Sequence, residues 1–300
     1  MITALHLHDL QNFYHKYPFL DIEQLIAYYS IYGGIDIDIP LNPLKSINDS
    51  IKDSFVKDFE QMKLLIKPSY LMENPYRSIS MAVALGDGRL SNIYRRAKVG
   101  EEAGSEVIKH MVDLGIFAIE HSRQAPLKRY SKQLLKKELR QYKIESKVRF
   151  AKPFYRFWFA FVEPYLDDLG KGSSKDFLQN YHKHKERIES LLFEQLSMML
   201  LQKYLGEKIV SKGSFWDHHS EFDLLVVTES GKRVLGECKY TSRPITKKEL
   251  TKLKEKASIS GIKSDTFALF SKSGFSNELM ELESRDTILF DLDDFEALLV

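Results

Sequence analysis

Residues 221–239 read Glu-Phe-Asp-Leu-Leu-Val-Val-Thr-Glu-Ser-Gly-Lys-Arg-Val-Leu-Gly-Glu-Cys-Lys, and this pattern predicts two strands joined by a tight turn. If Glu229-Ser230-Gly231 forms a three-residue loop, Gly231 takes the left-handed conformation that such loops favour. Thr228 then pairs with Lys232 across the turn. The turn thereby sets the register of the whole hairpin.

The two predicted strands carry charged side chains at positions that converge. Counting back from the turn places Asp223 opposite Glu237, and Lys239 shares the face of Glu237 because strand side chains alternate. Adjacent carboxylates repel each other, and a hard divalent cation, Mg²⁺ or Mn²⁺, relieves that repulsion. A bound metal activates water, and a neighbouring lysine stabilises charge on a phosphate. We therefore expect Asp223, Glu237 and Lys239 to catalyse phosphodiester hydrolysis.

Solvated cross-strand pairs are the alternative interpretation of these charges. The neighbouring residues argue against it, because they are apolar, as in a strand buried on both faces: Phe222, Leu224 to Val227, Val234 and Leu235. Unpaired charge inside such strands is expensive, so its presence needs a reason. Cys238 alternates with the charged residues, and we expect it on the opposite face as a small buried hydrophobe.

The elements predicted around the hairpin follow a definite order. An amphipathic helix is predicted over 184–205, and Glu194 is the only acidic residue between Leu191 and Leu205. A lysine-rich helix over 246–258 and a strand over 266–270 come after the hairpin. This order resembles the PD-(D/E)xK nuclease superfamily and is most similar to its archaeal junction-resolvase and Mrr-like restriction branch.

The resemblance implies roles for individual residues. Glu194, Asp223 and Glu237 correspond to the metal ligands, and Lys239 corresponds to the catalytic lysine. Phe222 stands where the superfamily's name has proline, a position that varies among its members.

The middle of the chain predicts a winged helix. Three short helices are expected over 75–85, 91–97 and 101–114, followed by a strand over 116–120 that opens the wing. Winged helices also serve as protein-interaction modules, and that alternative stays open. If this one binds DNA, the candidate contacts are Ser105, Lys109 and His110 on the third helix and Lys128 and Arg129 on the wing.

The net charge of +2 hides a strong segregation of charge. Residues 121–152 hold eleven Lys or Arg and two acids, and residues 239–256 hold seven basic and two acidic residues. Clustered positive charge favours a polyanionic partner, although a solvated helix face remains the alternative. Lys248 and Lys252 are candidate contacts to a DNA backbone. Residues 276–300 hold eight acids and one arginine, and we expect them to end in a packed helix.

An aromatic segment at 150–165 holds eight aromatic residues in sixteen. Such rings can stack on bases, but a core helix that bridges two domains is the favoured interpretation. This segment, with the motifs at 213–217, 236–239 and 270–275, is similar to the archaeal-type ATPase family, whose C-terminal part is catalogued as domain of unknown function 234. Residues 22–34 resemble the helix and Gly-Gly turn of that family's ATPase lid.

The P-loop signature Gly-x-x-x-x-Gly-Lys-Ser/Thr is absent from the sequence, so nucleotide-driven work is not expected of it. The resemblance therefore implies an α/β and α multi-domain fold that retains the lid, the winged helix and a restriction-endonuclease-like domain. The expected regions are 1–70, a helical lid-like region; 71–150, a winged helix-turn-helix domain; 151–183, aromatic connecting helices; and 184–300, a PD-(D/E)xK nuclease-like domain.

Together these patterns predict a metal-dependent DNA endonuclease in the cytoplasm. No apolar run in the sequence is long enough to cross a bilayer, and the single cysteine cannot form an internal disulfide. The expected substrate is duplex or branched DNA, and homodimerisation is a further expectation, since a double-strand cut needs two sites. Two alternatives stay open: a non-catalytic DNA-binding regulator that keeps the nuclease scaffold, and an interaction subunit for a separate ATPase.

Overall fold

The computed structural model describes residues 5–35, 38–124, 134, 144–217 and 219–299. Contacts between residues divide the chain into two compact units. Unit 1 comprises Met1–Glu120, Ser146–Leu192 and Leu298–Val300; unit 2 comprises His121–Glu145 and Phe193–Ala297.

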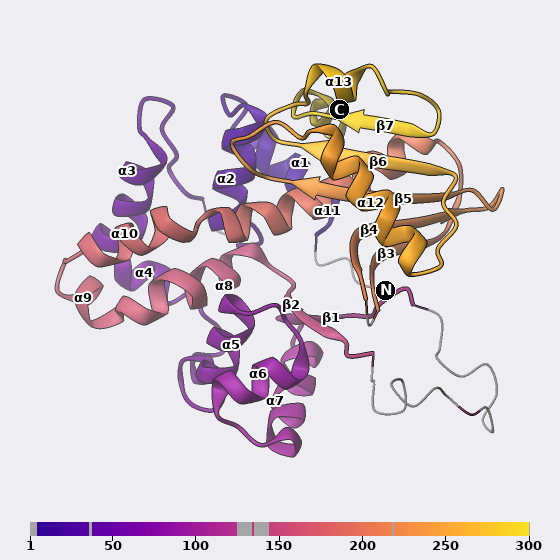
Figure 1. The fold of residues 1–300 in the computed structure, drawn as a ribbon. Helices are drawn as coiled ribbons and strands as arrows, with labels where there is room; N and C mark the ends of the chain where they lie inside the picture. The colour runs from indigo at the N-terminus through magenta and orange to yellow at the C-terminus, as the bar shows by residue number, and fades with distance from the viewer. Residues whose placement is uncertain (1–4, 36–37, 125–133, 135–143, 218, 300) are drawn as a thin grey trace. The chain divides into compact units, whose positions relative to one another are not determined.

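Unit 1 is mostly helical (Figure 1). Its helices are α1 (Leu7–Lys16), α2 (Ile22–Tyr32), α3 (Ile47–Lys52), π-helix η1 (Asp53–Lys57), α4 (Phe59–Lys63), 3₁₀-helix η2 (Ser69–Met72), α5 (Tyr76–Leu85), α6 (Leu90–Ala97), α7 (Glu101–Asp113), α8 (Pro153–Phe157), π-helix η4 (Trp158–Val162), 3₁₀-helix η5 (Glu163–Tyr165), α9 (Leu166–Gly170) and α10 (Lys175–His184). Helix α11 (Glu186–Leu205) begins in unit 1 and ends in unit 2.

Local sequence signals explain where α2 begins and ends. Asp21 and Gln24 form a reciprocal capping box at its start, which satisfies backbone donors that the first turn leaves free. The helix stops at the Gly33–Gly34 pair, and Gly34 adopts a φ of 82° that favours glycine. The helix and glycine turn expected over 22–34 are therefore present.

Three helices and a two-stranded sheet occupy the middle of the chain. Helices α5, α6 and α7 are followed by β1 (Phe117–Glu120), which pairs antiparallel with β2 (Lys147–Phe150). Gly115 follows α7 with a φ of 67°, as expected of a residue just past a helix end. The second helix ends at Lys98, a left-handed residue, and Gly100 instead caps the start of α7.

The aromatic segment lies inside unit 1. The rings of Phe154, Phe157, Trp158 and Phe159 are fully buried, so they cannot stack on nucleic acid bases in this conformation. Glu163 is buried beside them, where it accepts hydrogen bonds from Trp158 Nε1 at 2.9 Å and Arg77 Nε at 2.6 Å. The expectation of a core segment is therefore correct.

Unit 2 is built around a five-stranded mixed sheet with the order β3-β4-β5-β6-β7. The first three strands are antiparallel neighbours, and β5, β6 and β7 are parallel. Its elements after α11 are β3 (Ile209–Trp216), β4 (Glu221–Thr228), β5 (Arg233–Lys239), α12 (Lys247–Ile259), β6 (Thr266–Ser271), α13 (Asn277–Met280), β7 (Thr287–Phe290) and 3₁₀-helix η6 (Asp293–Leu298).

The β4–β5 hairpin has the register that its turn predicts. The amide of Thr228 donates to the carbonyl of Lys232 at 3.0 Å, and Gly231 has a φ of 85°. Leu224 pairs with Gly236 further along the ladder, so the next opposing positions are Asp223 and Glu237. A short loop with one left-handed glycine is therefore enough to place the two carboxyl groups at opposing positions on the two strands.

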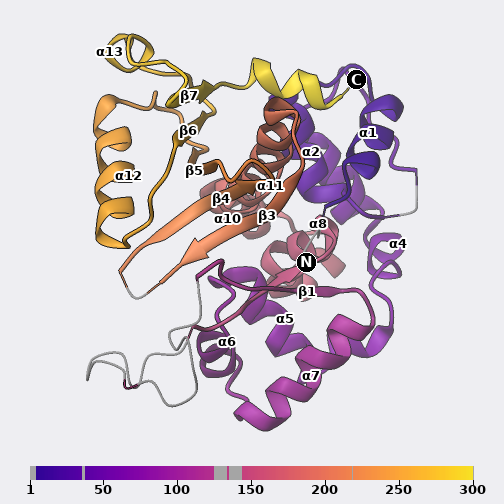
Figure 2. The same cartoon turned by 90° about the vertical axis from the view of Figure 1, so that its right-hand side faces the viewer.

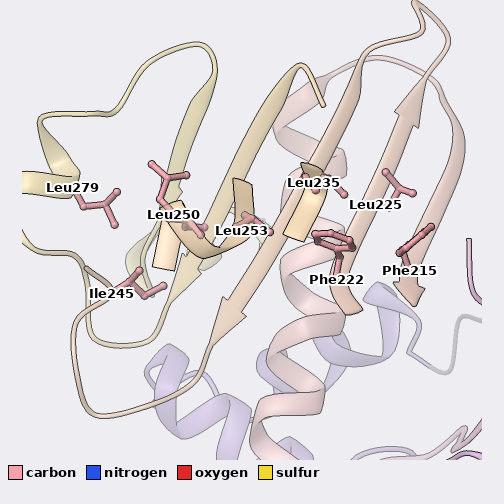
Figure 3. Close-up of a cluster of buried hydrophobic side chains, with 10 residues drawn as sticks. Phe215, Phe222, Leu225, Leu235, Ile245, Leu250, Leu253 and Leu279 are labelled. Carbon is pink, nitrogen blue, oxygen red and sulfur yellow. The ribbon is translucent and has the colours of Figure 1, made fainter. Parts of the chain in front are cut away.

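Opposite faces of the sheet are covered by α12 and by the second half of α11 (Figure 2). Leu250 and Leu253 of α12 pack in one apolar cluster with Phe222 and Leu235 of the sheet (Figure 3). On the other face, the ring of Phe193 in α11 packs against the ring of Tyr240, and the two ring centroids are 5.3 Å apart. Because side chains alternate along β5, Glu237 lies on the α12 face and Cys238 on the α11 face.

The acidic C-terminal segment ends in a packed helix, as expected, and it also contains a strand that was not expected. The strand is β7, and the final helix is the 3₁₀-helix η6. The acids lie mainly outside the Thr-Ile-Leu-Phe core of β7, and Phe295 is 1% exposed. The strand could not be predicted from the sequence, because its apolar run is short and lies between acidic residues. Its pairing with β6 depends on contacts between distant parts of the chain.

Candidate active site

Two carboxyl groups meet near the end of the β4–β5 hairpin. Asp223 is half-buried, and one oxygen of its carboxyl group, Oδ2, accepts a hydrogen bond of 2.8 Å from the backbone N–H of Cys238. Glu237 lies at the opposing position on β5, and its side chain is 12% exposed. The predicted pair is therefore brought together by backbone pairing.

Two lysines bind the Glu237 carboxylate, one at each oxygen. Lys239 Nζ donates to Oε1 at 2.5 Å, and Lys256 Nζ of α12 donates to Oε2 at 3.1 Å. Lys239 was expected on this face. Lys256 was not expected, because it is one of several lysines on α12 and its contact with Glu237 depends on how the helix packs on the sheet.

The environment shifts the protonation of these groups. Burial, followed by the charge of Glu237, raises the pKa of Asp223 from 3.8 to about 6. Burial lowers the pKa of Lys239, but the neighbouring carboxylates outweigh this effect, so that the pKa lies above its usual value. The Asp223 shift indicates that a second negative charge is unfavourable here, even with two lysines nearby.

Glu194 lies on the side of the sheet that faces α11. Its charge acts on the Cys238 thiol, whose neighbours also include Ser197 of α11, and burial raises the pKa of that thiol well above 9.0. Cys238 is buried, as expected of an unreactive thiol. Within the described ranges, no group of three or more His, Cys, Asp or Glu side chains is arranged to hold a metal ion. The structure thus places Asp223 opposite Glu237, and the charges of Glu194, Asp223 and Glu237 all act on the Cys238 thiol.

The residues expected to contact DNA from the third helix, α7, of the middle module (helices α5 to α7 with strands β1 and β2) have different surroundings. Lys109 of α7 is exposed. The hydroxyl of Ser105 is hydrogen-bonded to Tyr94 at 2.8 Å, and His110 Nε2 lies 2.8 Å from the hydroxyl of Tyr70. Ser105 and His110 are exposed as well, so all three residues lie at the surface, and two of them have side-chain hydrogen-bond partners.

The remaining expected DNA contacts divide in two. Lys128 and Arg129 lie outside the described residues. Lys248 and Lys252 are exposed on α12, the helix that also carries Lys256. Glu249 belongs to the capping box at the start of this helix, which defines the first turn that carries Lys248; Lys252 lies one turn further on.

Unit 1 contains a separate cavity of about 420 Å³. Side chains of α1 and α2 line it together with Lys152, and none of the residues predicted for catalysis or DNA contact does. Its charges are mixed, since Asp9, Lys16 and Lys152 all line it, and they do not specify one ligand class.

Comparison with known proteins finds one family model that matches part of the chain. Residues 158–255 match the family model described as archaea bacterial proteins of unknown function, DUF234. The match covers about a third of the chain and supports the resemblance to that family over these residues. No curated protein and no solved structure matches the chain. Among the residues that the structure describes, none of the helices has both the length and the apolar character that a bilayer span requires.

Proposed function

We propose that this protein is a metal-dependent DNA endonuclease whose active site is the Asp223–Glu237 pair with Lys239. The observation that carries the proposal is the placement of two carboxyl groups and an ammonium on one face of neighbouring strands. Buried charges of this kind need a function or a partner, and burial together with the charge of Glu237 raises the pKa of Asp223, which supports the proposal.

The donor set fits a hard divalent cation. Mg²⁺ uses one or two protein carboxylates together with water and substrate phosphate, so Asp223 and Glu237 suffice to hold it or Mn²⁺. A bound ion of this type supplies an activated water and polarises the phosphate. Lys239 lies beside the pair and stabilises negative charge that develops on the phosphate during hydrolysis. Glu194 remains a candidate for indirect support from the α11 face.

The middle module supports DNA as the substrate. Helices α5 to α7 with the β1–β2 pair have the element order of a winged helix-turn-helix, in which the third helix enters the major groove. The exposed Lys109 on that helix and the basic residues of α12 provide phosphate contacts without sequence specificity.

A non-catalytic scaffold is the second candidate function. Glu237 is already neutralised by Lys239 and Lys256, and the described part of the chain offers no three-ligand metal group. A charge-balanced cluster of this kind can persist for structural reasons alone. In that case the protein binds DNA or a protein partner and cuts nothing.

Cleavage and binding must be measured separately to distinguish the two functions. Plasmid and four-way-junction DNA are incubated with Mn²⁺ and the wild type, Asp223→Asn or the control Glu229→Gln, an exposed acid on the hairpin loop. DNA affinity is measured by fluorescence anisotropy in EDTA. The nuclease loses cleavage only in Asp223→Asn and keeps its DNA affinity. Absence of cleavage by the wild type on both substrates, with DNA binding intact, favours the scaffold.

A further inference from the structure

We infer that Lys256 is a second functional lysine of the carboxylate site, and that it moves from Glu237 to a phosphate group when nucleic acid binds. The inference rests on the proposed function, and it specifies how the substrate and the metal come to share one site. Lys256 lies one residue beyond the family-model match at 158–255, so its role follows from the structure alone.

The position of Lys256 suits such an exchange. Its ammonium group lies 3.1 Å from Glu237 Oε2 and 3.3 Å from the carbonyl oxygen of Glu221. The Lys256 side chain is 38% exposed, whereas that of Glu237 is 12% exposed. The ammonium group is therefore at the boundary between the carboxylate and solvent. A lysine has a flexible stem and a strongly hydrated head, so it can reach a second anion from the same backbone position.

Lys256 also ends a row of lysines on α12. Lys248, Lys252 and Lys256 are spaced four residues apart. Each step advances about 6 Å along the helix and turns by about 40°, so the three heads form a ridge that winds from the exposed surface toward the sheet. Lys248 and Lys252 are exposed and available to phosphates. A strand that follows this ridge brings a phosphate to Lys256, next to the carboxyl pair.

The exchange has a consequence for metal binding. Both oxygens of Glu237 are occupied, Oε1 by Lys239 and Oε2 by Lys256. Lys239 is on β5, two residues from Glu237, and stays close to its carboxylate. Lys256 is on α12, and it can bind a DNA phosphate in place of Glu237. Its departure frees Oε2 and removes one positive charge from the pair. DNA therefore raises the affinity of the site for a divalent cation, and by linkage the cation raises the affinity for DNA.

The test measures each ligand without the other. Mn²⁺ is titrated calorimetrically into DNA-free protein, and a labelled duplex oligonucleotide is titrated in EDTA at several salt concentrations. The variants are Lys256→Gln, Lys256→Arg and the control Lys254→Gln, whose lysine is exposed on the same helix. We expect Lys256→Gln to bind Mn²⁺ at least about fivefold more tightly. The same variant should bind DNA more weakly, with the slope of log affinity against log salt reduced by about one.

The two effects have opposite signs, which a merely structural role does not produce. Lys256→Arg retains the charge and should behave like the wild type in both titrations. Unchanged affinities in Lys256→Gln, or a parallel loss of both, overturn the inference while the proposed nuclease stands. If the wild type binds no Mn²⁺, the proposed function fails, and the exchange mechanism fails with it.

Discussion

Replacement of Asp223 by asparagine should stabilise the metal-free protein at neutral and alkaline pH. The burial of Asp223 beside Glu237 raises its pKa from 3.8 to about 6. The folded protein therefore binds this proton more tightly than the unfolded chain does. As a result, the wild type loses stability as the pH rises from about 4 to about 7. Asparagine keeps the shape and can still accept the hydrogen bond from Cys238, but it carries no charge.

The magnitude follows from the size of the shift. Raising the pKa from 3.8 to about 6 corresponds to at most about 3 kcal/mol. Because Asp223 is only half-buried, water screens part of this, and we expect the variant to be more stable by about 2 kcal/mol at pH 8. The advantage should shrink to about 0.5 kcal/mol near pH 4, because the carboxyl group is then protonated in the folded protein and nearly half protonated in the unfolded chain.

Urea denaturation of both proteins in EDTA between pH 4 and pH 8 measures this difference, with Glu229→Gln as the exposed control. The control should stay within about 0.5 kcal/mol of the wild type at each pH. In buffer without EDTA, free Mn²⁺ at 100 times its dissociation constant should stabilise the wild type by about 2.7 kcal/mol and leave Asp223→Asn unchanged. If the two proteins are equally stable at pH 8, Lys239 and Lys256 fully compensate the second charge, and the argument from buried charge is refuted.

Three further predictions concern catalysis, the core and the hairpin. Lys239→Gln should reduce DNA cleavage by about 100-fold or more while DNA affinity in EDTA stays within a few-fold, because the lysine acts on the developing charge; an equal loss of affinity would contradict this role. Glu163→Ala should lower the free energy of unfolding by about 3 kcal/mol, because it leaves the buried N–H of Trp158 and the guanidinium of Arg77 unpaired. A loss below about 1 kcal/mol in urea denaturation would contradict this. Gly231→Ala should lower the free energy of unfolding by about 1 kcal/mol in the same assay. The cost comes from the backbone alone, because φ is 85° and no neighbouring atom would contact the added methyl group. Gly231→Asn should cost less, and equal stability of Gly231→Ala and the wild type would argue against a left-handed residue in the turn.

The hairpin shows how far sequence reasoning reaches when structure is local. The loop length and one glycine fix the register, and the register places Asp223 opposite Glu237 without any knowledge of the rest of the chain. Helix boundaries such as those of α7 and α12 also follow from nearby residues, a glycine past the end or a capping threonine before the start.

Contacts between distant elements were not predictable in the same way. Lys256 resembles every other lysine of α12 until the helix is packed on the sheet through Leu253, at which point its head meets Glu237. Its position next to the apolar face of the helix was the one available signal. Glu194 lies on a different element from the carboxyl pair, and its charge acts on the Cys238 thiol together with those of Asp223 and Glu237. Its role as a metal ligand stays a prediction from the family order.

The path of the chain between the two units decides how the protein can be divided. The backbone passes from one unit to the other four times, after Glu120, Glu145, Leu192 and Ala297. A fragment that starts at residue 184 therefore omits a segment that unit 2 uses.

The hydroxyl of Ser122 bonds both the amide and the carbonyl of Trp216, and the Trp216 indole donates to the carbonyl of Glu145. Without these partners the end of β3 presents unpaired backbone groups, which favours self-association. Dissection of this protein should thus keep residues 121–145 with the sheet, as a circular permutant or a co-expressed peptide would allow.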